Sequence, residues 1–177
     1  MTSTINIRPV QPDMLETLVQ LEQQTFTETF RDTYSKEDME TFLSEKKGIA
    51  AIERELLTEG AHYYICYHDD APAGFLKLNL DKQPDDEAHT VLPTPVMELE
   101  KIYVLQAFQG LKLGKALIQY AYAVAREHKI KIIWLGVWEH NTKARAFYEW
   151  EGFERFSEHR FMVGSQLDTD LLYKKTV

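Results

Sequence analysis

The fold is decided by one continuous stretch, which reads ELEKIYVL (residues 98–105), QAFQGLKLGK (106–115) and ALIQYAYAVAREH (116–128). The first part is typical of a β-strand and the second of a glycine-containing turn. The third part is predicted to be helical because its apolar residues recur at three- and four-residue spacing. A strand followed by such a turn and a helix places backbone N–H groups where an anion can bind.

Two lysines lie at the predicted start of this helix, Lys112 in the turn and Lys115 in the first helical turn. A cation near a helix N-terminus is disfavoured by roughly 0.3–1 kcal/mol unless an anion compensates it. A bound phosphate would remove this conflict, so we expect the turn to hold a phosphate-bearing cofactor. The alternative is two solvated surface lysines, because a loop with two glycines is a weak signal by itself.

Composition indicates a single domain, residues 1–177, with 44% apolar residues to build a core. The net charge of -8, from 28 acidic and 20 basic residues, argues against nucleic acid or an anionic membrane as a partner. Cys66 is the single cysteine, so we expect no disulfide and a small core residue there, and the histidines lack metal-ligand spacing. Since neither a signal-type leader nor eighteen consecutive apolar residues occur, we expect a soluble cytoplasmic protein.

The rest of the chain is predicted to alternate between strands and helices. Two segments are exceptions: residues 25–34 are expected to form a loop over a binding site, and residues 81–95 an exposed excursion. Further strands are expected at 5–10, 62–68, 74–80, 130–138, 153–163 and 169–174, and further helices capped by Asp13, Ser35 and Asn141 and at 49–57.

The order strand, helix, strand over residues 98–138 implies a parallel pair with a right-handed crossover. The short turn between the strands at 62–68 and 74–80 implies an antiparallel hairpin. The predicted fold class is therefore α/β: a mixed, largely antiparallel sheet of six or seven strands with a central parallel pair, flanked by about four helices.

Two segments make the chain resemble the GCN5-related N-acetyltransferases, an acyl-CoA-dependent superfamily. One is the strand 99–104 leading to QGLKLG (109–114), and the other is NTKARAFYEWEGF (141–153). In the family's turn pattern, Gln/Arg-x-x-Gly-x-Gly/Ala, Lys112 stands at the first glycine, where its N–H can still point inward if its φ is negative. The second segment, with residues 134–140 before it, is similar in particular to bacterial spermine/spermidine N-acetyltransferases.

The resemblance implies acetyl-CoA as cosubstrate. The backbone of Ile102, Tyr103 and Val104 would pair with the pantetheine arm as an added strand pairs with a sheet edge. Asn141 would hydrogen-bond the pantetheine, and Tyr148 would lie beside the sulfur. The pyrophosphate would be ringed by the N–H groups of Gln109, Gly110, Leu111, Lys112, Leu113, Gly114 and Lys115.

The implied reaction is direct attack of an amine on a thioester in a ternary complex. An alkylamine with a pKa of about 10.4 is protonated at pH 7, so a base is needed. Glu100 matches a carboxylate base in polyamine-acetylating relatives, and Tyr148 is the candidate acid for the leaving thiolate. The alternatives are a surface lysine partner for Glu100, a core role for Tyr148 and a plain helix cap for Asn141.

The predicted acceptor is a small cationic amine, with a polyamine preferred. Charge and cation–π contacts make Glu28, Phe30 and Tyr34 candidates for binding it, although loop packing would also explain them. Glu98, the neighbour expected to raise the pKa of Glu100, and His140, which could line the pocket or be a plain loop histidine, are further candidates. Alternative acceptors are a peptide N-terminus, an amino acid or an antibiotic, and a CoA-binding sensor or scaffold without turnover is the alternative from another class. Dimers are common in such families, so a homodimer stands beside a monomer as an alternative.

Overall fold

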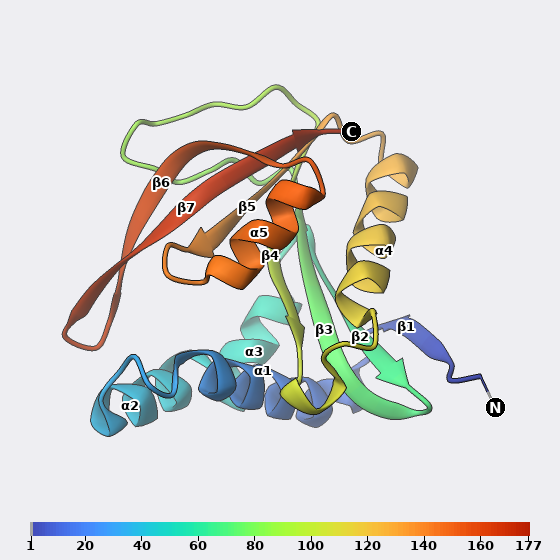
Figure 1. Ribbon diagram of the computed structural model, residues 1–177, viewed down its shortest axis with the longest axis vertical. Coiled ribbons are helices and arrows are strands. Elements are labelled where there is room, and N and C mark those ends of the chain that lie inside the picture. Colours follow the sequence, from blue (N-terminus) through green and yellow to red (C-terminus); the bar gives the residue numbers. More distant parts are fainter. Residues whose placement is uncertain (1) are drawn as a thin grey trace.

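The computed structural model describes residues 2–177, which form one seven-stranded sheet with helices on both faces (Figure 1). The described part has five α-helices, one more than the approximate number expected. The strands are β1 (Ile5–Pro9), β2 (Ala61–His68), β3 (Ala71–Leu80), β4 (Val96–Val104), β5 (Ile132–Trp138), β6 (Glu154–Val163) and β7 (Gln166–Thr176). The helices are α1 (Leu15–Phe30), α2 (Lys36–Lys46), α3 (Ile49–Leu56), α4 (Leu113–Glu127) and α5 (Thr142–Trp150), with 3-10 turns η1 (Pro12–Met14) and η2 (Gln106–Phe108).

The strands of the sheet follow the order β1-β2-β3-β4-β5-β7-β6. All neighbours are antiparallel except β4 and β5, which confirms the predicted central parallel pair. These two strands pair only from Val96 to Glu98, opposite Ile132 to Trp134. Beyond that point they diverge (Figure 1), so the facing edges of β4 and β5 have no partner strand there.

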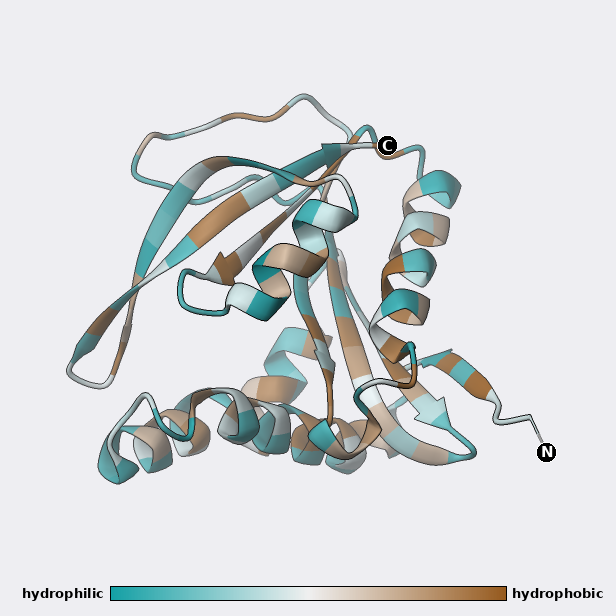
Figure 2. Cartoon of the chain, viewed as in Figure 1, coloured by the Kyte–Doolittle hydropathy of each residue, from teal (hydrophilic) through white to brown (hydrophobic). Residues whose placement is uncertain are grey.

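Hydrophobic residues recur along the strands (Figure 2). Their side chains alternate between the two faces of the sheet and build a core on each. The larger core packs under α4 and α5, and the smaller one under α1 and α3. Cys66 belongs to the larger core and is fully buried, as predicted. Burial raises the pKa of its thiol to about 11, so it stays protonated and inert.

The prediction for residues 25–34 was wrong in part, because α1 continues to Phe30. Phe26 stacks on Phe42 at 4.5 Å between ring centroids, and Phe30 packs against Trp138 at 5.2 Å. These tertiary contacts outweigh the low helix propensity of the threonines in this segment. The expected cap was also wrong: Asp13 lies in η1, and the residue before α1 is Met14.

The other predicted helix ends are confirmed. The hydroxyl of Ser35 accepts a hydrogen bond from the Asp38 N–H at 3.0 Å, and the Asn141 side-chain oxygen accepts one from the Ala144 N–H at 3.1 Å. Gly152 follows α5 with a φ of 91°, a left-handed conformation that favours glycine. Within residues 2–177, no helix has both the length and the apolar character of a membrane-spanning segment.

The excursion between β3 and β4 is anchored at two points. Asp86 is buried and accepts hydrogen bonds from the N–H and the hydroxyl of Thr90, both at 2.7 Å, and from the hydroxyl of Ser157. Leu92 is buried in a small cluster with Trp134. No residue of 81–95 lines the cavities described below.

Candidate active site

A cavity of about 200 Å³ lies where β4 and β5 diverge. Its walls come from α1 on one face of the sheet and α5 on the other, with β4, β5 and β7 between them. Glu100 and Tyr148 both line it, so the predicted base and the predicted acid share one cavity.

Glu100 is brought to the cavity by an irregularity in β4. Lys77 of β3 pairs with Lys101 and Leu78 pairs with Leu99, which leaves Glu100 as the extra residue of a bulge. A bulge of this kind turns a side chain away from the ordinary alternation of a strand. One Glu100 oxygen lies 2.7 Å from Lys77 Nζ, and the other accepts a hydrogen bond from Asn79 at 3.3 Å.

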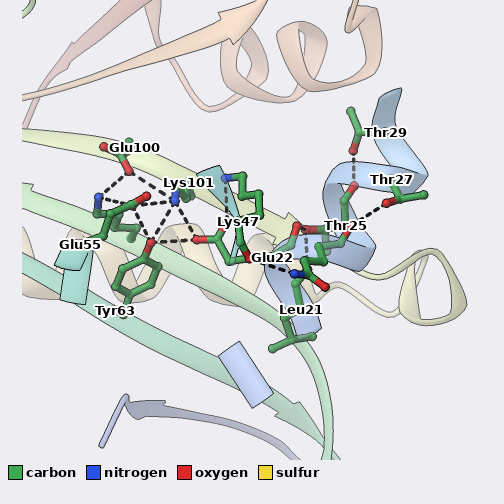
Figure 3. Close-up of polar contacts among 12 residues, drawn as sticks. Leu21, Glu22, Thr25, Thr27, Thr29, Lys47, Glu55, Tyr63, Glu100 and Lys101 are labelled. Atoms are coloured by element: carbon green, nitrogen blue, oxygen red, sulfur yellow. Dashed lines mark hydrogen bonds and ion pairs between the residues drawn. The ribbon is translucent and has the colours of Figure 1, made fainter. Parts of the chain in front are cut away.

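Glu100 belongs to a cluster of paired charges beside the cavity (Figure 3). Lys101 Nζ lies 2.7 Å from a Glu22 oxygen and 2.8 Å from a Glu55 oxygen. Burial raises the pKa of Glu55. The charge of Lys101 and the hydrogen bonds from Lys101 and Lys77 outweigh this effect and lower the pKa to about 2. Burial lowers the pKa of Lys101, but the neighbouring carboxylates outweigh this and raise it. Glu55 and Lys101 therefore stay ionised at neutral pH.

Glu98 lies near this cluster but does not line any of the cavities. Its carboxylate accepts a hydrogen bond from Asn79 at 2.7 Å. Burial, and then the negative charge of Glu100, raise the pKa of Glu98 to about 7. The structure thus gives this predicted substrate-binding residue no direct access to the cavity.

The raised pKa of Glu98 makes stability depend on pH. Because the pKa is about 7 in the folded protein and 4.5 for an ordinary glutamate, the folded state binds more protons between these values. Stability therefore falls as the pH rises through this window. We expect Glu98→Gln, which keeps an acceptor for Asn79, to raise the free energy of unfolding by about 2–3 kcal/mol at pH 8 and to change it little at pH 4. Denaturant unfolding at both pH values measures the difference.

Glu55→Gln is the matched control, because the pKa of Glu55 is shifted in the opposite direction. Burial raises this pKa, but the nearby lysines outweigh burial and lower it to about 2. Folding favours the ionised form of this carboxylate, so neutralising it is expected to destabilise the protein at pH 8. A similar loss of stability in both variants at pH 8 would contradict the contrast between the two carboxylates.

On the opposite side of the cavity, an unpaired strand edge lies close to α5. Apart from Glu100 in the bulge, residues 99–104 pair with β3, and none of them pairs with β5. Ile102 and Tyr103 line this cavity, while Val104 lines a second cavity of about 270 Å³. Asn141 lines both cavities, so the two adjoin at the N-terminal end of α5.

Tyr148 has a free hydroxyl beside this edge. It is 6% exposed, and its hydroxyl makes no hydrogen bond within residues 2–177. Burial, followed by the proximity of Tyr103 and Tyr122, raises its pKa, so the phenol keeps its proton at physiological pH. The oxygen of Asn141 caps α5, and its amide nitrogen donates no hydrogen bond in the described chain, so it can contact a ligand as well.

The loop before α4 presents backbone N–H groups without partners. Within residues 2–177, the N–H groups of 110–115 donate no hydrogen bond. A side chain added at Gly110 or Gly114 would meet no atom within 4 Å, so the space beside both is open. Lys115 Nζ lies 2.6 Å from a Glu151 oxygen, which fixes one of the two lysines. Unpaired amides at a helix N-terminus form an anion site.

Lys112 differs from the expectation, because its φ is +66° rather than negative. The position keeps the left-handed backbone that favours glycine, at a cost of about 1–2 kcal/mol for another residue. Lys112→Gly would relieve this strain, but glycine also raises the conformational entropy of the unfolded chain, which offsets part of the gain. We therefore expect the substitution to stabilise the protein by about 0.5–1 kcal/mol. Thermal unfolding measures this change. Lys112→Ala removes the same charge but keeps the strain, so an equal gain in that variant would contradict the backbone explanation.

The candidate acceptor residues do not converge on one point. Phe30 lines the cavity beside Glu100, whereas Glu28 and His140 line the second cavity. The hydroxyl of Tyr34 donates a hydrogen bond to Asp168, and the residue is buried outside both cavities. Only Phe30 of this set therefore lines the cavity that the predicted base lines.

Several cavity residues were missed from the sequence. Asp170 on β7 and Glu22 and Lys47 from the helical layer line the same cavity as Glu100. The signal for Asp170 was two aspartates, at 168 and 170, which share one face of the strand just before its apolar run Leu171–Tyr173. No pattern pointed to Lys47, because its partner Glu22 lies 25 residues away in the chain.

The chain matches the family model described as Acetyltransferase (GNAT) family over residues 15–153. It belongs to the GNAT family of N-acetyltransferases. An uncharacterised N-acetyltransferase in the pepI 3′ region of Lactobacillus delbrueckii subsp. lactis is 37% identical to this acetyltransferase over 173 residues, 98% of each chain. The family resemblance seen in the sequence is thereby confirmed.

A more distant sequence match and a structure of the same fold both come from Thermoplasma acidophilum. A spermidine N(1)-acetyltransferase is 23% identical over 155 residues, 85% of this chain and 89% of that protein. The crystal structure of PaiA N-acetyltransferase in complex with coenzyme A has a TM-score of 0.77 at 22% identity, covering 98% of this chain and 99% of that one. Acetyl-CoA is the cosubstrate of the family, and the unpaired amides of 110–115 and the free edge of β4 fit such a ligand.

Proposed function

We propose that this acetyltransferase transfers the acetyl group of acetyl-CoA to the primary amine of a small cationic acceptor, with a polyamine such as spermidine preferred. The observation that carries the proposal is the shared cavity, which Glu100 and Phe30 line on the acceptor side and Asn141 and Tyr148 on the donor side. The net charge of -8 also favours a polycationic partner.

The donor side would hold the cosubstrate through its own unpaired groups. The N–H groups of 110–115 would receive the pyrophosphate, and the backbone of 102–104 would pair with the pantetheine arm. The amide nitrogen of Asn141 would donate to the same arm. When bound, acetyl-CoA supplies an activated acyl carbon as a thioester.

The reaction then needs two proton transfers. A nitrogen–carbon bond forms as the amine attacks, and the carbon–sulfur bond breaks. Glu100 would accept the proton that the amine loses, and Tyr148 would give its proton to the leaving sulfur. Because Lys77 and Asn79 already contact the two oxygens of Glu100, we favour a proton relay through water over direct contact with the amine.

The preference for a polyamine draws on the distant likeness to a spermidine N(1)-acetyltransferase. The aromatic side chains that line the acceptor side, among them Phe26, Phe30 and Trp138, also suit an alkylammonium, because their ring faces attract cations.

A panel of acceptors tests the proposal by detecting the free thiol of CoA. It should contain spermidine, spermine and putrescine, with an amino acid, a peptide with a free N-terminus and an aminoglycoside for comparison. We expect kcat/KM to be highest for spermidine or spermine. A higher value for the peptide would overturn the acceptor assignment, and calorimetric binding of CoA without transfer to any amine would support a sensor or scaffold.

A further inference from the structure

The positive and negative charges of the cluster beside the cavity balance one another. Each of its carboxylates lies within 2.8 Å of a lysine nitrogen, and the numbers of acids and bases are equal. Paired charges of this kind offer little net attraction to an arriving cation. The members are Glu22, Glu55 and Glu100 with Lys47, Lys77 and Lys101.

Asp170 is a carboxylate of the same cavity that lacks such a partner. It lies on β7 opposite Trp138 of β5, and within residues 2–177 its side chain has no ion pair and no hydrogen bond. The titratable side chains that influence the pKa of Asp170 are His159, which lies opposite on β6, and Asp168 on its own strand. Burial, which outweighs the opposing effect of His159, raises the pKa of Asp170 to about 6, so it is mostly ionised above pH 7.

Gly136 gives Asp170 its access to the cavity across β5. A Cβ atom at this position would lie 3.3 Å from the Asp170 Oδ2 atom, tighter than ordinary van der Waals contact. Gly136 itself lines the cavity. The missing side chain therefore leaves the space through which the carboxylate of the outer strand β7 reaches the cavity.

Aromatic side chains surround this carboxylate site. Trp138 and Phe30 meet edge to face at 5.2 Å between ring centroids, and Phe26 and Phe161 line the same cavity. Ring faces attract an ammonium group and also pack against the methylene groups beside it. A single unpaired negative charge among aromatic rings is chemically suited to an alkylammonium ion.

We propose that Asp170 is the residue that selects a cationic acceptor, by pairing its carboxylate with an ammonium group of an alkylamine that lies against Phe30 and Trp138 in the cavity. This inference rests on the proposed function, since it concerns the acceptor side of the same cavity. It assigns to Asp170 a role in substrate binding and leaves the proton transfers to other groups.

The test compares Asp170→Asn with Asp170→Glu and with Asp85→Asn, which removes the same charge from an exposed position outside the cavity. Calorimetry with spermidine in the presence of CoA measures binding without turnover. We expect Asp170→Asn to raise the Kd and the KM for spermidine by about 30-fold or more, because one partner of a buried charge pair is lost. The kcat should stay within about threefold and the Kd for CoA should not change.

Asp170→Glu is expected to restore most of the binding, and Asp85→Asn to behave like the wild type. Gly136→Ala provides a second variant, since its methyl group crowds Asp170 Oδ2, and it should raise the KM for spermidine as well. Unchanged spermidine binding in Asp170→Asn, or a fall in kcat at constant KM, would overturn the inference.

The two proposals fail separately in this experiment. If the wild type binds spermidine but acetylates no amine, while Asp170→Asn loses the binding, the proposed function fails and the role of Asp170 stands. If the wild type acetylates spermidine and Asp170→Asn does so with the same KM, the role of Asp170 fails alone. A wild type that binds no spermidine in the presence of CoA overturns the assignment of Asp170.

Discussion

Tyr148→Phe is expected to lower kcat by a factor of about 100 or more, because the leaving thiolate would lose its positioned proton donor. The phenol lines the cavity, and its hydroxyl makes no hydrogen bond within residues 2–177, so its proton is free for the reaction. Burial raises its pKa, so ionisation of this group should not limit activity at the alkaline pH of a normal assay. Steady-state kinetics with the best amine of the panel measures the effect.

Tyr122→Phe is the matched control for this substitution. It removes a buried hydroxyl that donates to a Glu151 oxygen at 3.1 Å, and Tyr122 does not line the cavity. We expect some loss of stability but little change in kcat. Full turnover in Tyr148→Phe at every pH would show that another group, or water, protonates the sulfur.

The donor side of the site was largely predictable because it is made of consecutive residues. The loop 109–115 and the helix cap Asn141 are local patterns, which can be recognised from a few neighbouring residues in the sequence. The strand 99–104 was equally visible. What the sequence did not reveal is the bulge at Glu100, which depends on the register of β3 against β4.

The acceptor side was less predictable because distant segments build it. Asp170 reaches the cavity only because β7 pairs with β5 and because residue 136 is a glycine. The threonine-rich end of α1 looked like a loop, yet aromatic contacts with α2 and β5 keep it helical. Neither strand order nor such contacts follow from periodicity within one segment.

The charged cluster explains why Glu100 has a lysine partner inside the fold. Glu22, Glu55 and Lys101 come from α1, α3 and β4, so the cluster ties the helical layer to the strand that carries Glu100. Breaking it should affect stability and the position of Glu100 together. Replacing both members of a buried ion pair is often less harmful than replacing one.

Lys101→Met is therefore expected to lower the free energy of unfolding by about 3–5 kcal/mol at pH 7, because buried carboxylates lose a partner. Lys101 Nζ lies 2.7 Å from Glu22, 2.8 Å from Glu55 and 2.9 Å from the Tyr63 hydroxyl, and all three lose this contact. Since Lys101 and Lys77 hold the pKa of Glu55 at about 2 against the effect of burial, the difference from the wild type should shrink as the pH falls from about 4.5 towards 2. Denaturant unfolding at pH 7 and pH 3 measures both effects.

Two further variants test the explanation of this loss. Lys36→Met breaks an exposed pair with Glu40 at 3.9 Å and should cost under about 0.5 kcal/mol. The double variant Glu22→Gln with Lys101→Met removes one charge of each sign, so it should recover part of the stability lost in Lys101→Met. If the double variant lost as much free energy of unfolding as the two single variants together, the loss in Lys101→Met would come from packing of the lysine stem instead of from an unpaired buried carboxylate.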